Sequence, residues 1–209
     1  MKSPRAFRSV AIVAGAAPFV ALLAACGSDA GAEPTPTSTA ASSSSAVAEP
    51  SQSPVAASCP SAPPAAGGTP EWTLPGTTGN VAVIGSTDSA APEIKVAGPF
   101  SVTATQVHTL TAGDGPVVPD TATVSVCYMG VNGRDGTTFD SSYERGEPAE
   151  FPLDGVVPGF QKAIAGQKVG STVAVAMDPA DGYPEGQPSA GIQKGDSLVF
   201  AIKILGITG

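Results

Sequence analysis

Residues Tyr128–Phe160 read YMGVNGRDGTTFDSSYERGEPAEFPLDGVVPGF. Aromatic and branched apolar residues recur there among glycines and prolines. The segment contains no His or Cys, so it lacks the Ser–His and Cys–His pairs that covalent catalysis often uses. This composition indicates an apolar slot that holds a ligand and does not attack it covalently.

Aromatic residues are concentrated in and after this segment. Beyond residue 25 the chain has five Phe, three Tyr and one Trp. A single Phe or Tyr in a strand is usually a core residue, but such uneven placement suggests a shared cavity. The six that we assign to it are Tyr128, Phe139, Phe151, Phe160, Tyr183 and Phe200.

The flanking segments predict strands and one helix. Period-two alternation marks Thr121–Tyr128, Ser171–Met177 and Leu198–Leu205 as half-buried strands. Phe100–Leu110 reads as another strand, and Glu93–Val96 as an additional short one.

Helical spacing occurs once, where Phe160, Ala163 and Ile164 follow Pro158 and precede Gly166. One short helix among antiparallel strands predicts an α+β fold in which a bent sheet wraps around the helix. We expect this domain at residues 106–209 and an N-terminal flank packed on it at residues 70–105.

Residues 1–25 have the features of an export signal. Three basic residues precede an apolar run, from Val10 to Leu23, that is too short for a comfortable membrane span. The run ends Leu-Ala-Ala-Cys at Cys26, which resembles a bacterial lipobox, and the resemblance implies cleavage and diacylation of Cys26. An ordinary secretory signal with an incidental Cys is the alternative.

Residues 26–69 are dominated by Ala, Ser, Thr and Pro, and we expect a disordered linker. Some forty such residues reach roughly 35 Å. We therefore predict a protein on the outer face of the bacterial cytoplasmic membrane, anchored by its acylated Cys26.

Charge and cysteine content agree with export. Removing the three basic residues of the signal takes the formal net charge from −8 to −11. No basic patch is present, so we expect no nucleic-acid partner. Cys59 and Cys127 remain beyond Cys26, and the sequence leaves open whether they form a disulfide. One His, His108, makes a metal site improbable, and we predict no cofactor.

An ordered set of motifs resembles the FKBP-type peptidyl-prolyl cis–trans isomerases. It covers about Val107 to Ile207 in the family's order. The motifs are TTFDSS at 137–142, RGEP at 145–148, FPL at 151–153, VVPGF at 156–160, GQKVG at 166–170 and LVF at 198–200. The resemblance implies the family's bent sheet around one helix and an isomerase that acts on X–Pro bonds.

The resemblance also implies the roles of the site residues. Tyr128, Phe139, Asp140 and Tyr183 match the catalytic positions, with Tyr183 as donor to the substrate. Arg145 matches the usual ion partner of Asp140, and a backbone amide of the Val156–Val157 pair matches the donor to a ligand carbonyl. The remaining slot residues are Phe151, Phe160, Ile192 and Phe200.

The reaction explains these residue types. An X–Pro amide exchanges in tens to hundreds of seconds because rotation breaks its conjugation. An apolar slot favours the less dipolar twisted amide over the planar one, and that difference alone accelerates rotation. No proton transfer or covalent intermediate is needed.

Departures from the family pattern bear on turnover and on the affinity for macrolide inhibitors. Ala149 stands where many relatives have an aromatic residue, and Phe160 stands where the family often has a large indole side chain. Pro184 and Gln193-Lys194 also differ from the residues usual in the family, and the link Asp154-Gly155 before Val156 is shorter than in the family. The alternative to an isomerase that assists folding of exported proteins is a non-catalytic surface module that grips prolyl segments. Intact Tyr183, Asp140 and Phe139 favour the enzyme.

Overall fold

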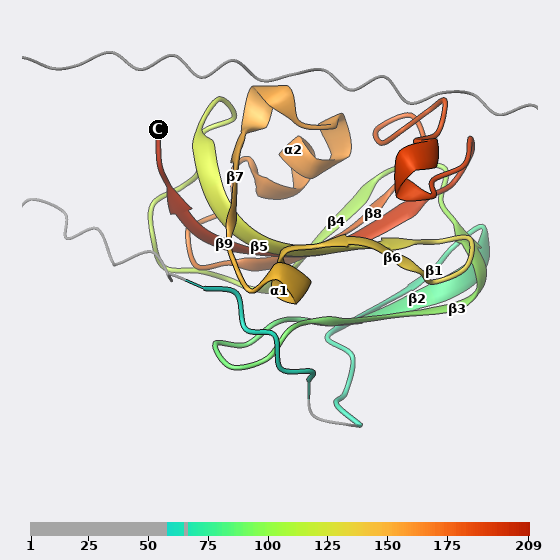
Figure 1. Ribbon diagram of the computed structural model, residues 1–209, viewed down its shortest axis with the longest axis horizontal. Helices are drawn as coiled ribbons and strands as arrows, with labels where there is room; N and C mark the ends of the chain where they lie inside the picture. The colour runs from blue at the N-terminus through green and yellow to red at the C-terminus, as the bar shows by residue number, and fades with distance from the viewer. Residues whose placement is uncertain (1–57, 65–66) are drawn as a thin grey trace, which may run out of the picture. The chain divides into compact units, whose positions relative to one another are not determined.

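A computed structural model describes residues 58–64 and 67–209 (Figure 1). The predicted signal, Cys26 and most of the predicted linker lie outside these residues. Among the residues described, no helix is long and apolar enough to cross a membrane.

The main sheet has six strands, all antiparallel to their neighbours. Its path is β4 (Gln106–Thr111), β8 (Thr172–Met177), β9 (Leu198–Ile207), β5 (Thr123–Asn132) and β6 (Thr138–Ser141). β7 (Ala149–Pro152) pairs with the first half of β5, next to the segment that β6 pairs. The three strands predicted from period-two alternation are confirmed as β5, β8 and β9. They were expected to be half-buried, but β8 is buried along its whole length and β5 and β9 along most of theirs, because both faces of the sheet are covered.

The sheet curves around α2 (Pro158–Ile164), as Figure 1 shows. Pro158 begins the helix, and Phe160, Ala163 and Ile164 are its buried apolar residues. Gly166, at φ 80°, follows the last turn and donates its N–H to the Val118 carbonyl. The predicted α+β fold, a bent sheet around one short helix, is confirmed. Further short helical segments are α1 (Ser142–Arg145), η1 (Leu153–Gly155) and η2 (Pro188–Ala190).

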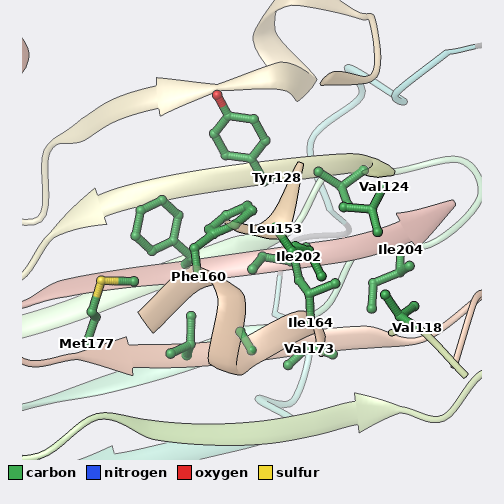
Figure 2. Packing of buried hydrophobic residues seen from close by; sticks show 14 of the residues in the cluster. Val118, Val124, Tyr128, Leu153, Phe160, Ile164, Val173, Met177, Ile202 and Ile204 are labelled. Carbon is green, nitrogen blue, oxygen red and sulfur yellow. The ribbon is translucent and has the colours of Figure 1, made fainter. Parts of the chain in front are cut away.

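The main core lies between the sheet and α2. Inward residues of β5, β8 and β9 pack against the helix in alternating positions (Figure 2). Those drawn there include Val124, Tyr128, Val173, Met177, Ile202 and Ile204, which contact Leu153, Phe160 and Ile164 in the same cluster.

A second, three-stranded antiparallel sheet covers the opposite face of the main sheet. It consists of β1 (Trp72–Pro75), β2 (Thr78–Ile84) and β3 (Glu93–Ser101). Its Val81, Val83 and Phe100 share a core with small main-sheet residues, Ala174, Ala176 and Ala201. The second sheet thus buries the face of the main sheet opposite α2, here called the back face. The small alanine side chains on this face allow the two sheets to pack closely.

The prediction of a single strand from Phe100 to Leu110 was wrong. Phe100 belongs to β3, and β4 begins only at Gln106. The chain changes sheets between them, and alternating apolar residues on both sides of the break hid it. His108, expected on a strand, lies on β4 and stacks on Trp72 with ring centroids 5.6 Å apart.

Cys59 and Cys127 form a disulfide, with Cα atoms 5.7 Å apart. Cys127 faces away from the side occupied by Tyr128, because neighbouring residues of a strand point to opposite faces. Both cysteines are buried with Ala91 and Tyr143. Residues 26–69 were expected to form the linker, yet the Cys59 N–H donates to the Gly146 carbonyl of the domain, and the Ala62 carbonyl accepts from the Ala91 N–H of the N-terminal flank. Sequence composition did not reveal this because the pairing partner of Cys59 lies 68 residues away.

Candidate functional site

A cavity of about 400 Å³ opens on the α2 side of the main sheet. Elements from across the chain line it: β5, β6, β7, the segment before α2, α2 itself, the β8–β9 connection and β9. The lining residues are Tyr128, Phe139, Asp140, Phe151, Gly155, Val156, Val157, Phe160, Tyr183 and Phe200. All six aromatic residues assigned to a shared cavity therefore converge on one.

Phe160 is the centre of the aromatic wall. Its ring makes edge-to-face contacts with Tyr128, Phe151 and Phe200, with centroids 5.5–5.8 Å apart. Phe139 contacts Phe200 in the same way at 5.5 Å. Each such contact adds about 0.5–1.5 kcal/mol beyond simple burial, so the rings stabilise one another as well as forming an apolar wall.

The polar side of the cavity is a three-residue cluster. The Tyr128 hydroxyl donates to one carboxylate oxygen of Asp140, and Arg145 donates to the other at 2.5 Å. A second guanidinium nitrogen of Arg145 donates to the Tyr128 hydroxyl oxygen at 3.0 Å, and the guanidinium lies over the Tyr128 ring. Asp140 is thereby oriented at the rim of the apolar cavity.

These contacts keep Tyr128 protonated and Asp140 ionised. Burial, followed by the hydrogen bond to Asp140, raises the pKa of Tyr128 to about 12. Burial opposes ionisation of Asp140, but hydrogen bonds from Tyr128 and Arg145 and the charge of Arg145 outweigh it, and the pKa of Asp140 is lowered. The cluster thus presents one fixed negative charge that is compensated by Arg145.

The loop that carries Tyr183 is fastened to α2. Lys162 donates to both carboxylate oxygens of Asp181, at 2.6 and 2.8 Å, and the Asp181 carbonyl accepts from the Gly159 N–H at 2.9 Å. Tyr183 follows two residues later and is half-buried at the cavity. The start of α2 and this loop therefore form one wall.

The loop between η2 and β9, residues 191–197, is hydrogen-bonded to the β5–β6 hairpin. Asp196 is 7% exposed; it accepts from Asn132 Nδ2 at 2.7 Å, from the Gln193 N–H at 2.8 Å and from Arg134 Nε at 3.2 Å. Arg134 also donates to the Gly191 carbonyl at 3.1 Å. This cluster was not predicted, because Asn132 and Arg134 lie 64 and 62 residues from Asp196 in the chain.

Two predicted site residues do not line the cavity. Ile192 is 1% exposed and belongs to the main core, since the Gln187–Ile192 bridge turns it inward. Arg145 lies beside the cavity and contacts its lining residues Asp140 and Tyr128. Gly155 lines the cavity but was not predicted; with no side chain, it left no compositional signal.

The described part of the chain holds no group of three or more His, Cys, Asp or Glu residues arranged to bind a metal ion. What the cavity offers is an aromatic surface, a carboxylate at its rim and one phenol, Tyr183, outside the Tyr128–Asp140–Arg145 cluster. This arrangement suits binding of an apolar group with an adjacent polar backbone.

Comparison with known proteins agrees with this geometry. Residues 115–205 match the model of the family described as FKBP-type peptidyl-prolyl cis-trans isomerase. A probable FK506-binding protein of Corynebacterium glutamicum is 36% identical over 100 residues, which are 47% of this chain and 83% of the relative. The chain belongs to the FKBP family.

Two further proteins are similar to this chain. The FKBP-type 22 kDa peptidyl-prolyl cis-trans isomerase of Escherichia coli is 39% identical over 102 residues, 49% of each chain. A crystal structure of a peptidyl-prolyl cis-trans isomerase from Pseudomonas syringae aligns with 50% of this chain and 76% of its own, with 28% identity and a TM-score of 0.46. The chain thus spans about half the length of the Escherichia coli relative.

Proposed function

We propose that this FKBP-family chain is a peptidyl-prolyl cis–trans isomerase. The observation that carries the proposal is the convergence of Tyr128, Phe139, Phe151, Phe160 and Phe200 on one cavity with Asp140 and Tyr183. The prolyl ring would sit against Phe160, surrounded by ring edges. This apolar surface favours the twisted amide, whose carbonyl is less dipolar, over the planar ground state.

The polar groups orient the substrate. Tyr183 would donate from its hydroxyl to a substrate carbonyl, and a backbone amide of Val156 or Val157 would donate to another. Asp140 would face the rotating carbonyl, held by Tyr128 and Arg145. Each 1.4 kcal/mol by which these groups favour the twisted state over the planar state is a tenfold gain in rate.

A protease-coupled assay on a proline tetrapeptide tests the activity. The mature domain should accelerate exchange, and Phe139→Ala should lower kcat/KM because it removes one wall of the slot. Val83→Ala is the control: it also truncates an apolar side chain, but in the core between the two sheets, away from the cavity. If neither the mature domain nor Phe139→Ala accelerates exchange, the isomerase proposal fails, and the non-catalytic module that grips prolyl segments replaces it.

Substrates and inhibitors follow from the same slot. We propose prolyl segments of exported polypeptides as substrates and macrolides as ligands of the cavity. Fluorescence of Trp72 is a poor probe because this partly buried residue packs against the core between the two sheets and does not line the cavity. Calorimetric titration of a macrolide, with Phe160→Ala as the variant that should abolish binding, measures this directly.

We further propose that the protein is exported and anchored by diacylated Cys26. The lipobox-like segment of the sequence supports this, and a Cys59–Cys127 disulfide is typical of an oxidising compartment. Cys26→Ala should release the protein from membranes into the medium. Retention of Cys26→Ala in the membrane fraction would exclude the lipid anchor.

A further inference from the structure

The β5 strand changes partner at one point along its edge. β7 pairs with Thr123–Val126 and β6 pairs with Met129–Val131, so Cys127 and Tyr128 lie between the two pairings. α1 fills this gap: Ser142 Oγ accepts from the Tyr128 N–H at 2.8 Å and donates to the Tyr128 carbonyl at 3.3 Å. The Ser142 side chain thus satisfies the Tyr128 N–H and carbonyl, which pair with neither β6 nor β7.

Cys59 reaches α1 from the back of the sheet and contacts both of its ends. Its disulfide joins Cys127, its Sγ lies 3.5 Å from Ser142 Oγ, and its N–H donates to the Gly146 carbonyl at 3.1 Å. Gly146 is the residue that ends α1, in the left-handed conformation at φ 74°. We call these three links of Cys59 the clasp.

α1 needs outside support because it has only four residues, Ser142–Arg145. A helix of that length is not stable alone, since too few hydrogen bonds offset the cost of nucleation. Tyr143 is 1% exposed and anchors the middle of α1, with its hydroxyl 2.8 Å from Ser86 Oγ. The clasp supports the two ends, and the last residue is Arg145.

Arg145 is the residue for which this support matters. Its side chain is 49% exposed, so packing does little to hold it, while its guanidinium bonds both Asp140 and Tyr128. A shift in the end of α1 would therefore move the guanidinium away from both partners.

We propose that Cys59 is a positioning residue for the slot: through the clasp it holds α1 so that Arg145 fixes Asp140 and Tyr128. This inference rests on the proposed isomerase function. It assigns a role in the site to a segment that precedes the isomerase domain and lies on the other side of β5. Both cysteines are shielded, at 3% and 1% exposure, so the link is held away from solvent.

A double-mutant cycle tests the clasp. The paired variant Cys59→Ala/Cys127→Ala should lower kcat/KM at least about threefold, within the range of coupling between residues of one network. Arg145→Ala should lower it as well. Adding the cysteine changes to Arg145→Ala should have no further effect, because the clasp acts through Arg145. An unchanged kcat/KM in the cysteine variant, or the same loss with and without Arg145, would overturn the proposal.

Two measurements separate positioning from loss of stability. Ser142→Ala keeps the disulfide but removes the Ser142 hydroxyl, which contacts Cys59 Sγ and bonds the Tyr128 backbone. This variant should lower kcat/KM too, and it serves as the test if the cysteine variant does not fold. Carboxyl NMR of the folded variants should show the pKa of Asp140 rising toward its ordinary value. An inactive wild-type domain would count against the isomerase function only. An Asp140 pKa that stays low in both Cys59→Ala/Cys127→Ala and Ser142→Ala would refute the positioning role of Cys59.

Discussion

The two faces of the main sheet differ in the residues they present and in what covers them. On the α2 face, β5 and β9 present Tyr128 and Phe200 to a cavity that stays open at its rim. On the back face, β8 and β9 present Ala174, Ala176 and Ala201 to a second sheet that packs closely. Large rings around a hollow suit binding, whereas small side chains under a covering sheet suit cohesion. The same strands therefore serve binding on one face and stability on the other.

The largest effect is expected from Phe100→Ala on the back face. Phe100 is 2% exposed between the two sheets, and truncation of a buried Phe costs about 3–5 kcal/mol. The free energy of unfolding, measured in urea, should fall by that amount, while kcat/KM per folded molecule should stay within about twofold of wild type. A large loss of kcat/KM in fully folded protein would show that the faces are not separable in this way.

Gly130→Ala tests the cavity face. A Cβ on Gly130 would lie 2.7 Å from ring atoms of both Phe139 and Phe200, so the walls must move. Overpacking of this kind costs about 1–3 kcal/mol, and here it should also lower kcat/KM. Gly209→Ala is the control outside the cavity, since its methyl would meet only Thr123, at 3.6 Å. Equal effects of the two changes on kcat/KM would contradict the close packing around Gly130.

Arg145→Gln sharpens the electrostatic side of the comparison. The pKa of Asp140 lies below its ordinary value of 3.8. The ionised carboxylate therefore stabilises the folded state above pH 3.8, and this stabilisation is lost as the pH falls through the lowered pKa. Without the guanidinium the pKa should rise, and this loss should begin at higher pH. Unfolding measured from pH 2 to 6 checks the shift; identical acid profiles for the variant and wild type would exclude it.

Tyr128 gives the corresponding alkaline prediction. Its pKa rises from 10.0 to about 12 in the folded protein, so its protonated form adds stability that is complete below pH 10 and is lost as pH rises toward 12. Tyr128→Phe should remove this contribution. Tyr143→Phe is the matched comparison, because it removes a buried hydroxyl whose pKa is also near 12 but which bonds Ser86 and not Asp140. Both variants should alter stability between about pH 10 and 12 in urea unfolding, and only Tyr128→Phe removes the hydroxyl bonded to Asp140.

The smallest effect is expected at the exposed ion pair between Lys194 and Glu185. The side chains are 70% and 81% exposed and 2.9 Å apart, on a loop outside both cores. Lys194→Ala should change the free energy of unfolding by less than about 0.5 kcal/mol. A larger change in thermal unfolding would mean that this loop contributes to one of the two faces.

The cavity was predictable because its aromatic residues stand out locally. Tyr128 ends a predicted alternating strand, and Phe160 lies in the first turn of the single predicted helix. Period and composition therefore placed both on the inner side. Ile192 was assigned to the slot by resemblance, but the bridge to Gln187 turns it into the core. Tyr143 was missed because a buried anchor on a four-residue helix has no periodic signal.

The sequence by itself determined which strands alternate, where α2 begins and ends, and that a set of aromatic residues needed a common surface. These are properties of neighbouring residues, set by backbone period and by the conformations of proline and glycine. Only the tertiary structure decided that Cys59 pairs with Cys127, that β1–β3 form a covering sheet, and that Arg145 bonds Tyr128 in addition to Asp140, its expected partner. Such contacts depend on strand register and chain crossing over long separations, which local patterns do not encode.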